Sequence, residues 1–352
     1  MKLVPGSHRM FANDQTNPVA GCVRWAPAKS LWIGSMTLAA IVLAPLTFTW
    51  DEFFLFVFTS GVTLCFGHSV GMHRRLIHSS FDCPLWLEHL CVYLGTLVGM
   101  AGPIGMIRIH DFRDWAQRQS ACHDYSCHRA GFWRDAWWQL HCRLALAHPP
   151  TFRLEPRLAN DRFYAVVERT WMLQQLPWAA LFFAVGGWGW VVWSICVRVS
   201  VCVTGHWLVG HFAHKRGGQS FIVEGAAGQG YNVACAGLIS MGESWHNNHH
   251  AFPSSAKMGL FPGSDRPWLV LDQDVRSAWS RHQRQNTRGP SILAGTTPPF
   301  GRQRCVAGRA GALRSPDHDI AVRFPGTNPA AALCALVAQR ASQPACRNAL
   351  DY

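Results

Sequence analysis

The stretch LWIGSMTLAAIVLAPLTFTW, residues 31–50, decides the fold because it carries no charged side chain over twenty positions. An apolar helix of that length can cross a hydrocarbon core of about 30 Å. Residues 53–72 form a second apolar run, interrupted only by His68, and residues 171–186 and 189–212 form a second pair. The sequence therefore predicts an all-α integral membrane protein with four transmembrane helices in two hairpins.

Composition and charge agree with a membrane protein. Charged residues make up 15% of the 352 residues, whereas soluble chains average roughly 25%. The net charge is +12, and the basic residues flank the apolar runs. The positive-inside rule then places residues 1–30, residues 74–169 and everything after 214 in the cytoplasm. We expect a multi-pass protein with a histidine-rich helical cap facing the cytoplasm, and no nucleic-acid partner.

The chain divides into three parts. We expect residues 1–30 to be a loose cytoplasmic leader and residues 31–262 to be the membrane domain. Asp51 and Glu52 should form the outer turn of the first hairpin in that domain. Residues 263–352 become rich in Arg, Ala, Gly, Pro and Ser without helical or strand periodicity, which predicts a low-order tail. A shifted reading frame near Gly263 is an alternative explanation for that change. The thirteen cysteines show no paired spacing, so we expect them to be reduced.

Histidine is concentrated where the apolar runs end. The densest run is Gly242-Glu-Ser-Trp-His246-Asn-Asn-His249-His250-Ala-Phe-Pro253. On a helix, residues three and four apart share a face, so His246 aligns with His249 and His250. Other histidines gather near positions 68–78, 110–128 and 206–214. More than six imidazoles exceed the needs of one ion, and imidazole suits Zn, Cu, Fe or Ni. The pattern indicates two redox metal ions at a membrane face.

The histidine pattern resembles that of the integral-membrane fatty acid desaturases of the acyl-CoA (stearoyl) type. Gly71-Met-His73-Arg-Arg-Leu-Ile-His78 matches the family's first histidine box, and Gly242 through Pro253 matches its third. Asn232 stands where the family has an Asn before the helix that carries the third histidine box. The resemblance covers residues 31–262. It implies four membrane helices, a cytoplasmic cap and a centre of two iron ions held mostly by histidine.

The second histidine box departs from the family pattern. The aligned run, Arg113 to Gln119, lacks the three histidines expected there, and Gly210 takes the place of an Asn four residues before His214. Two interpretations stay open. In one, His110, His123, His128 and His206 substitute as ligands; in the other, the centre is crippled. Under the first, the metal ligands are His73, His78, His110, His123, His128, His206, His214, His246, His249 and His250.

The resemblance implies oxygen-dependent introduction of a double bond into a long acyl chain, supplied as an acyl-CoA, acyl-carrier or acyl-lipid substrate. The sequence holds no flavin, haem or iron–sulfur motif. The resemblance therefore implies an external electron donor such as a ferredoxin or a cytochrome b5-like protein. Two alternatives remain: a di-iron lipid or alkyl hydroxylase, which shares the oxidant, and a catalytically degenerate metal-binding relative.

Overall fold

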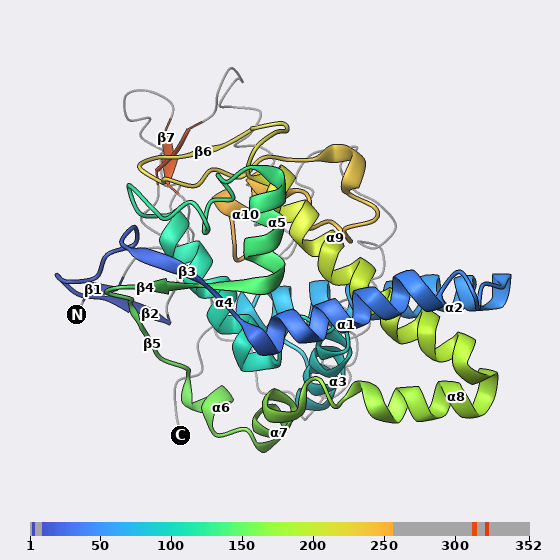
Figure 1. Ribbon diagram of the computed structural model, residues 1–352. Coiled ribbons are helices and arrows are strands. Elements are labelled where there is room, and N and C mark those ends of the chain that lie inside the picture. Colours follow the sequence, from blue (N-terminus) through green and yellow to red (C-terminus); the bar gives the residue numbers. More distant parts are fainter. Residues whose placement is uncertain (1, 4–8, 256–311, 315–320, 324–352) are drawn as a thin grey trace, which may run out of the picture.

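The computed structural model describes residues 2–3, 9–255, 312–314 and 321–323 (Figure 1). Helices dominate these residues, and short strands form three small sheets. The helices are α1 Pro27–Leu43, α2 Trp50–Val62, η1 Thr63–Ile77, α3 Leu85–Thr96, α4 Pro103–Gln117, α5 Phe132–His141, α6 Pro156–Ala159, α7 Arg162–Thr170, α8 Gln175–Val191, η2 Val192–Val197, α9 Arg198–Ala213, η3 Ala234–Ala236 and α10 His246–Ala251. The strands are β1 Lys2–Leu3, β2 Met10–Ala12, β3 Gly21–Trp25, β4 Cys142–Leu146, β5 Thr151–Phe152, β6 Ile222–Val223, β7 Ala312–Arg314 and β8 Ala321–Arg323.

The first predicted hairpin is present, but its turn lies earlier than expected. Helix α1 ends at Leu43, and α2 begins at Trp50. Pro45 falls between them, where a proline cannot continue a helix. Asp51 and Glu52 lie in the first turn of α2, where the helix dipole stabilises negative charge. The prediction that these two acids form the turn is therefore wrong.

The second hairpin is also present, and its turn lies where the glycines predict it. The helical segment 175–213 is interrupted at Gly187, whose φ of 70° and ψ of −160° are not helical. A positive φ of this size favours glycine. Figure 1 shows the α1–α2 and α8–α9 hairpins extending in the same direction, and η2 packs against α1 and α2. The two hairpins thus form one helical bundle.

The surface of this bundle is apolar. Two helical segments, Trp50–Ile77 and Gln175–Ala213, are long and apolar enough to cross a membrane. Large apolar side chains on both hairpins are exposed, with Leu46 at 78% and Trp188 at 70%. Extended apolar exposure of this kind marks a surface that contacts lipid or protein.

Arg198 lies inside the bundle and does not face its surface. Its side chain is buried and donates hydrogen bonds to the carbonyls of Ser194 and Leu97 and, at 2.7 Å, to Oε1 of Gln175. A charged group in an apolar setting must find such partners. Arg198 therefore ties α9 to the start of α8 and to the end of α3.

The cap is built from α3–α7 and two small sheets, so the expectation of an all-α fold holds only for the bundle. Strand β3 pairs antiparallel with β4, and β2 pairs with β1 and β5. Both sheets use residues before 26, so the strands at 2–3, 10–12 and 21–25 are not part of a loose leader. Arg9, 2% exposed, fixes the chain next to β2 by pairing with Asp111 and Glu155.

A buried carboxylate joins the cap to the end of η1. Glu88 on α3 accepts hydrogen bonds from Arg75 at 2.7 Å, Arg157 at 2.5 Å and the Tyr164 hydroxyl at 2.6 Å. Burial raises the Glu88 pKa, but these donors outweigh it and hold the pKa below its usual value. Around this network, Met72, Leu76, Val92, Ile107 and Leu158 form an apolar core.

The tail for which we expected low order, residues 263–352, lies outside the described residues except for two short strands, β7 and β8. Strand β8 pairs antiparallel with β6 and with β7.

Candidate metal centre

The first histidine box lies on a π-helix. Segment η1 has hydrogen bonds between residues five apart over fifteen residues. On an α-helix, residues five apart point in different directions, so His73 and His78 could not serve one site. In η1 they do converge, with ring centroids 4.9 Å apart. The two histidines can reach one site only if the helix between them is not a regular α-helix, and the π-helix meets this condition.

One group of four histidines gathers around this helix. The group comprises His73 from η1, His78 directly after the last residue of η1, His110 from α4 and His249 from α10, and their ligand atoms lie within 4.8 Å of one another. The ring centroids of His73 are 4.9 Å from those of His110 and 4.7 Å from those of His249. We call these residues the first group. Its members come from three helices far apart in the sequence, so it exists only in the folded chain.

The first group fits a metal ion. Four of its ring nitrogens are buried without a hydrogen-bond partner among the described residues: His73 Nε2, His78 Nε2, His110 Nδ1 and His249 Nδ1. Buried polar atoms are normally paired, and each exception calls for a missing partner. Neutral imidazole nitrogens so close together are suited to bind a cation.

A second group combines His214, at the end of α9, with His246 and His250 of α10. The Nε2 atom of His246 lies 3.0 Å from the Nε2 atoms of both His214 and His250. His214 Nδ1 lies 3.0 Å from the Gln229 carbonyl. A carbonyl can only accept, so Nδ1 carries the proton, and the Nε2 lone pair of His214 points into the group. We call these three residues the second group.

Helix α10 is held in place by asparagines of the third box and its surroundings. Asn232 Oδ1 accepts from the backbone N–H of Asn247 at 3.0 Å, which satisfies a free donor at the helix N-terminus. The Asn247 side chain binds the backbone of Ser220, Phe221 and Gly230. These contacts orient His246, His249 and His250 without using a metal, so the asparagines of the motif are positioning residues.

A carboxylate orients His73 of the first group. Glu243 Oε2 lies 2.5 Å from His73 Nδ1, and its other oxygen accepts from the Ser69 hydroxyl. Burial raises the Glu243 pKa, but the imidazole and Arg74 nearby outweigh it and lower the pKa well below its usual value. An ionised Glu243 fixes the proton of His73 on Nδ1 and leaves Nε2 free as a ligand.

A third cluster is a hydrogen-bond network. Asp135, fully buried on α5, accepts at Oδ2 from His128 Nδ1 at 2.9 Å, His211 Nδ1 at 2.7 Å and Trp207 Nε1 at 2.9 Å. Burial raises the Asp135 pKa, and these donors more than reverse the shift. Arg113 occupies the remaining nitrogen of His128, Nε2, at 2.9 Å. With its nitrogens paired in this way, His128 supports the centre through its ring, which stacks parallel to His214 at 5.4 Å.

The structure separates the remaining predicted ligands from both groups. His123 Nδ1 accepts from the backbone N–H of Tyr125 in the loop after α4. His206 on α9 packs edge-on against His68, with ring centroids 5.0 Å apart. Of the four proposed substitutes, only His110 joins histidines of the first and third boxes.

Sequence reasoning missed four supporting residues: Asp135, His211, Glu243 and Gln117. Glu243 stood within the third box, and its place beside the histidine run was the available signal. Gln117 lies seven residues after His110 on the same face of α4, and its Nε2 lies 3.0 Å from His214 Nε2. Nothing in the local sequence marks Asp135, because its partners lie up to 76 residues away.

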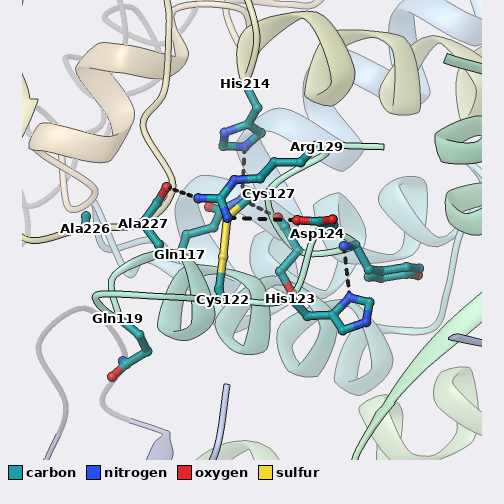
Figure 2. Close-up of a disulfide and its surroundings, with 12 residues drawn as sticks. Gln117, Gln119, Cys122, His123, Asp124, Cys127, Arg129, His214, Ala226 and Ala227 are labelled. Carbon is teal, nitrogen blue, oxygen red and sulfur yellow. Dashed lines mark hydrogen bonds and ion pairs between the residues drawn. A yellow bond between two sulfur atoms is a disulfide. The ribbon is translucent and has the colours of Figure 1, made fainter. Parts of the chain in front are cut away.

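The loop beside the second group contains a disulfide between Cys122 and Cys127 (Figure 2). The prediction of reduced cysteines is therefore wrong for this pair, because the turn after α4 brings two thiols together that are five residues apart. Figure 2 shows Gln117 linked to His214 next to this loop. Gln117 Nε2 also donates to the Ser126 carbonyl between the two cysteines, at 2.7 Å.

A cavity of about 1160 Å³ reaches both histidine groups. His73, His110, His214 and His246 contribute to its wall. Much of the remaining lining is apolar and comes from the bundle and the cap, including Ile33, Leu64, Met106, Phe152 and Val201. Such an enclosure can hold an apolar chain in a fixed position beside the ring nitrogens.

Similar proteins identify the family. The chain is 30% identical over 264 residues to the sn-2 palmitoyl-lipid 9-desaturase of Nostoc sp. (strain 36), covering 75% of this chain and 88% of that protein. The chain belongs to the fatty acid desaturase family. It is also 30% identical over 242 residues to the sn-1 stearoyl-lipid 9-desaturase of Synechocystis sp., covering 66% of this chain and 72% of that protein.

More distant plant desaturases match as well. The acyl-CoA 5-desaturase of Anemone leveillei is 29% identical over 230 residues, covering 65% of this chain and 70% of that protein. No family model matches the chain. The resemblance found in the histidine boxes is thus confirmed, and with it the assignment of this desaturase to the oxidoreductases.

Proposed function

We propose that this desaturase introduces a double bond into a long acyl chain, using O2 and two external electrons at a centre of two irons. The observation that carries the proposal is the pair of adjacent, partly buried imidazole groups on the wall of a largely apolar cavity. The first group would hold one iron and the second group the other. Bound there, iron would supply the reduction of O2 and the oxidant that removes two hydrogen atoms from the chain.

The balance of the reaction is fixed by its product. Two adjacent methylene groups lose two hydrogens, and O2 takes up these together with two electrons and two protons to give two molecules of water. The protein contributes position, because the cavity fixes which carbons lie beside the centre. A ferredoxin or a cytochrome b5-like protein would supply the electrons. The relatives are named for acyl-lipid and acyl-CoA substrates, and we propose one of these two classes here.

For the topology, we propose four spans formed by α1, α2 with η1, α8, and η2 with α9, and a cap facing the cytoplasm. The exposed apolar side chains of both hairpins support membrane burial. Basic residues around the cap support its orientation. Residues 31–262 would then be the desaturase domain, between the cytoplasmic segment 1–30 and the tail.

The test is iron content and lipid product from the same preparations. Protein purified from membranes should contain about two irons per chain, and cells expressing it should accumulate an unsaturated chain. His249→Ala should lose iron from the first group, whereas His123→Ala, outside both groups, should keep it. Mass spectrometry separates the alternatives, because a hydroxylase adds one oxygen atom to the product. Wild-type protein without iron would refute the proposal and favour the degenerate relative.

A further inference from the structure

The second group has fewer ligands than the first, although the two lie side by side. Four histidines form the first group, and three form the second. Gln117 contacts the second group, but it presents Nε2, a donor that cannot bind a metal, toward His214. That orientation is supported by the hydrogen bond from the same Nε2 to the Ser126 carbonyl. A ligand to complete the second group must therefore come from elsewhere.

Helix α4 runs from one group to the other. His110 belongs to the first group, and Gln117 touches the second. At 1.5 Å per residue, these two positions are roughly 10 Å apart along the axis, and they lie on the same face of the helix. Asp114 is four residues after His110 and three before Gln117, so it lies on that face between them. The helix thus places a carboxylate at the junction of the two groups.

Asp114 is a buried anion with no hydrogen bond to its carboxylate among the described residues. It is 8% exposed and lines the cavity, and its Oδ2 lies 3.9 Å from His110 Nδ1. The neighbouring Asp111 also lies near His110 Nδ1, at 3.7 Å, but its other oxygen is paired with Arg9 at 3.1 Å. A buried carboxylate is costly unless a cation or hydrogen-bond donors compensate it. Asp114 lies beside one of the imidazole nitrogens that have no hydrogen-bond partner, His110 Nδ1, so the same cation could compensate both.

Asp114 lines the same cavity as members of both groups. His73 and His110 of the first group and His214 and His246 of the second group also line this cavity. The Asp114 carboxylate therefore lies on the wall that the two groups share. Neutral imidazoles leave the charge of two Fe²⁺ uncompensated, whereas an anion between them lowers it.

The geometry points to Asp114 as a metal ligand shared between the two groups, in the segment where the second histidine box is missing. This inference rests on the proposed di-iron function. The centre would be of mixed histidine and carboxylate type, with seven imidazoles and one bridging carboxylate. His110 and Asp114 would then supply a nitrogen and an oxygen ligand from helix α4 in place of histidines that the second box lacks.

The experiment compares iron content and Mössbauer spectra of ⁵⁷Fe-loaded, detergent-purified protein. Asp114→Asn should lower iron from about two to about one per chain, with the second group emptied. Asp114→His should restore about two irons with altered Mössbauer parameters, because a nitrogen replaces an oxygen ligand. Asp111→Asn is the matched control for loss of a buried charge on the same helix, and the exposed Asp124→Asn is a second control; both should keep two irons. Size-exclusion chromatography verifies that each variant is folded.

Each outcome decides a separate point. If Asp114→Asn keeps two irons and an unchanged spectrum, Asp114 is not a ligand, although the di-iron function stands. If Asp111→Asn loses iron as Asp114→Asn does while Asp124→Asn keeps it, charge near the centre matters and ligation by Asp114 is refuted. If wild-type protein binds no iron, the proposed function fails together with this inference.

Discussion

The close packing of η1 against α3 gives a sharp test of how the centre is positioned. Gly71 lies two residues before His73 in the first box. A Cβ atom at Gly71 would lie 2.6 Å from the carbonyl carbon and 2.7 Å from the oxygen of Cys91. Both are backbone atoms, so no side chain can rotate away. Helix α3 would have to retreat by roughly 0.8 Å, the gap between 2.6 Å and the 3.4 Å at which ordinary contact begins.

Overpacking of this kind costs about 1–3 kcal/mol, and the rigid contact puts Gly71→Ala at the upper end. For a domain of this size, about 3 kcal/mol corresponds to a fall in Tm of roughly 6–12 °C. The shift also displaces His73, so the iron affinity of the first group should fall about 10–100-fold, as when supporting residues are lost.

Gly61→Ala is the matched control, because a Cβ there meets nothing within 4 Å. It should raise stability by up to about 1 kcal/mol through helix propensity alone. The assay is thermal unfolding in detergent, followed by tryptophan fluorescence with and without Fe²⁺. Equal Tm values for Gly71→Ala and Gly61→Ala would refute the argument that close helix contact holds the first box.

Three further outcomes follow from the same network of contacts. Asp135→Asn should destabilise the fold by about 2–3 kcal/mol in denaturant titration, because one acceptor oxygen serves three buried donors; an unchanged midpoint would contradict this. The pKa of Glu88 is lowered in the fold, so its stabilising effect is present at neutral pH and is lost as pH falls below about 4.5 through the folded pKa. Tm measured from pH 7 to pH 3 should therefore fall less steeply in Glu88→Gln than in wild type, and parallel curves would exclude this role. Removing metal with an iron chelator should lower the Tm of wild type more than that of His249→Ala, which lacks the iron of the first group from the start, since ligand binding stabilises only the folded state; equal falls in Tm would contradict this.

The sequence predicted what depends on local pattern and missed what depends on distant contacts. The apolar runs predicted the helices of both hairpins, and Gly186–Gly189 predicted the turn of the second hairpin. Both predictions rest on local properties, namely the length of an apolar run and the conformational preference of glycine. His73 and His78 converge because η1 is a π-helix. Their five-residue spacing indicates that the helix cannot be a regular α-helix, but it does not predict which irregularity occurs. Strand β3 pairs with β4 more than a hundred residues later, so residues 21–25 carried no recognisable signal of their own. Asp135 was missed for the same reason.

Gly210 offers a last test, because the family pattern places an Asn there. A Cβ at Gly210 would lie 3.2 Å from Nε2 and 3.4 Å from Cε1 of His128. Asp135 and Arg113 hold that ring at both nitrogens, so it cannot move aside cheaply, and the amide beyond the Cβ needs space that the ring occupies. Gly210→Asn should therefore destabilise the fold and loosen His214, which stacks on His128. Gly205→Asn on the same helix, with open space around it, should not. Removing the ring in the double variant Gly210→Asn/His128→Ala should recover stability, with a coupling of about 0.5–3 kcal/mol in a double-mutant cycle. Additive losses in that cycle would mean that His128 does not occupy the place of the family's Asn, and the glycine would need another explanation.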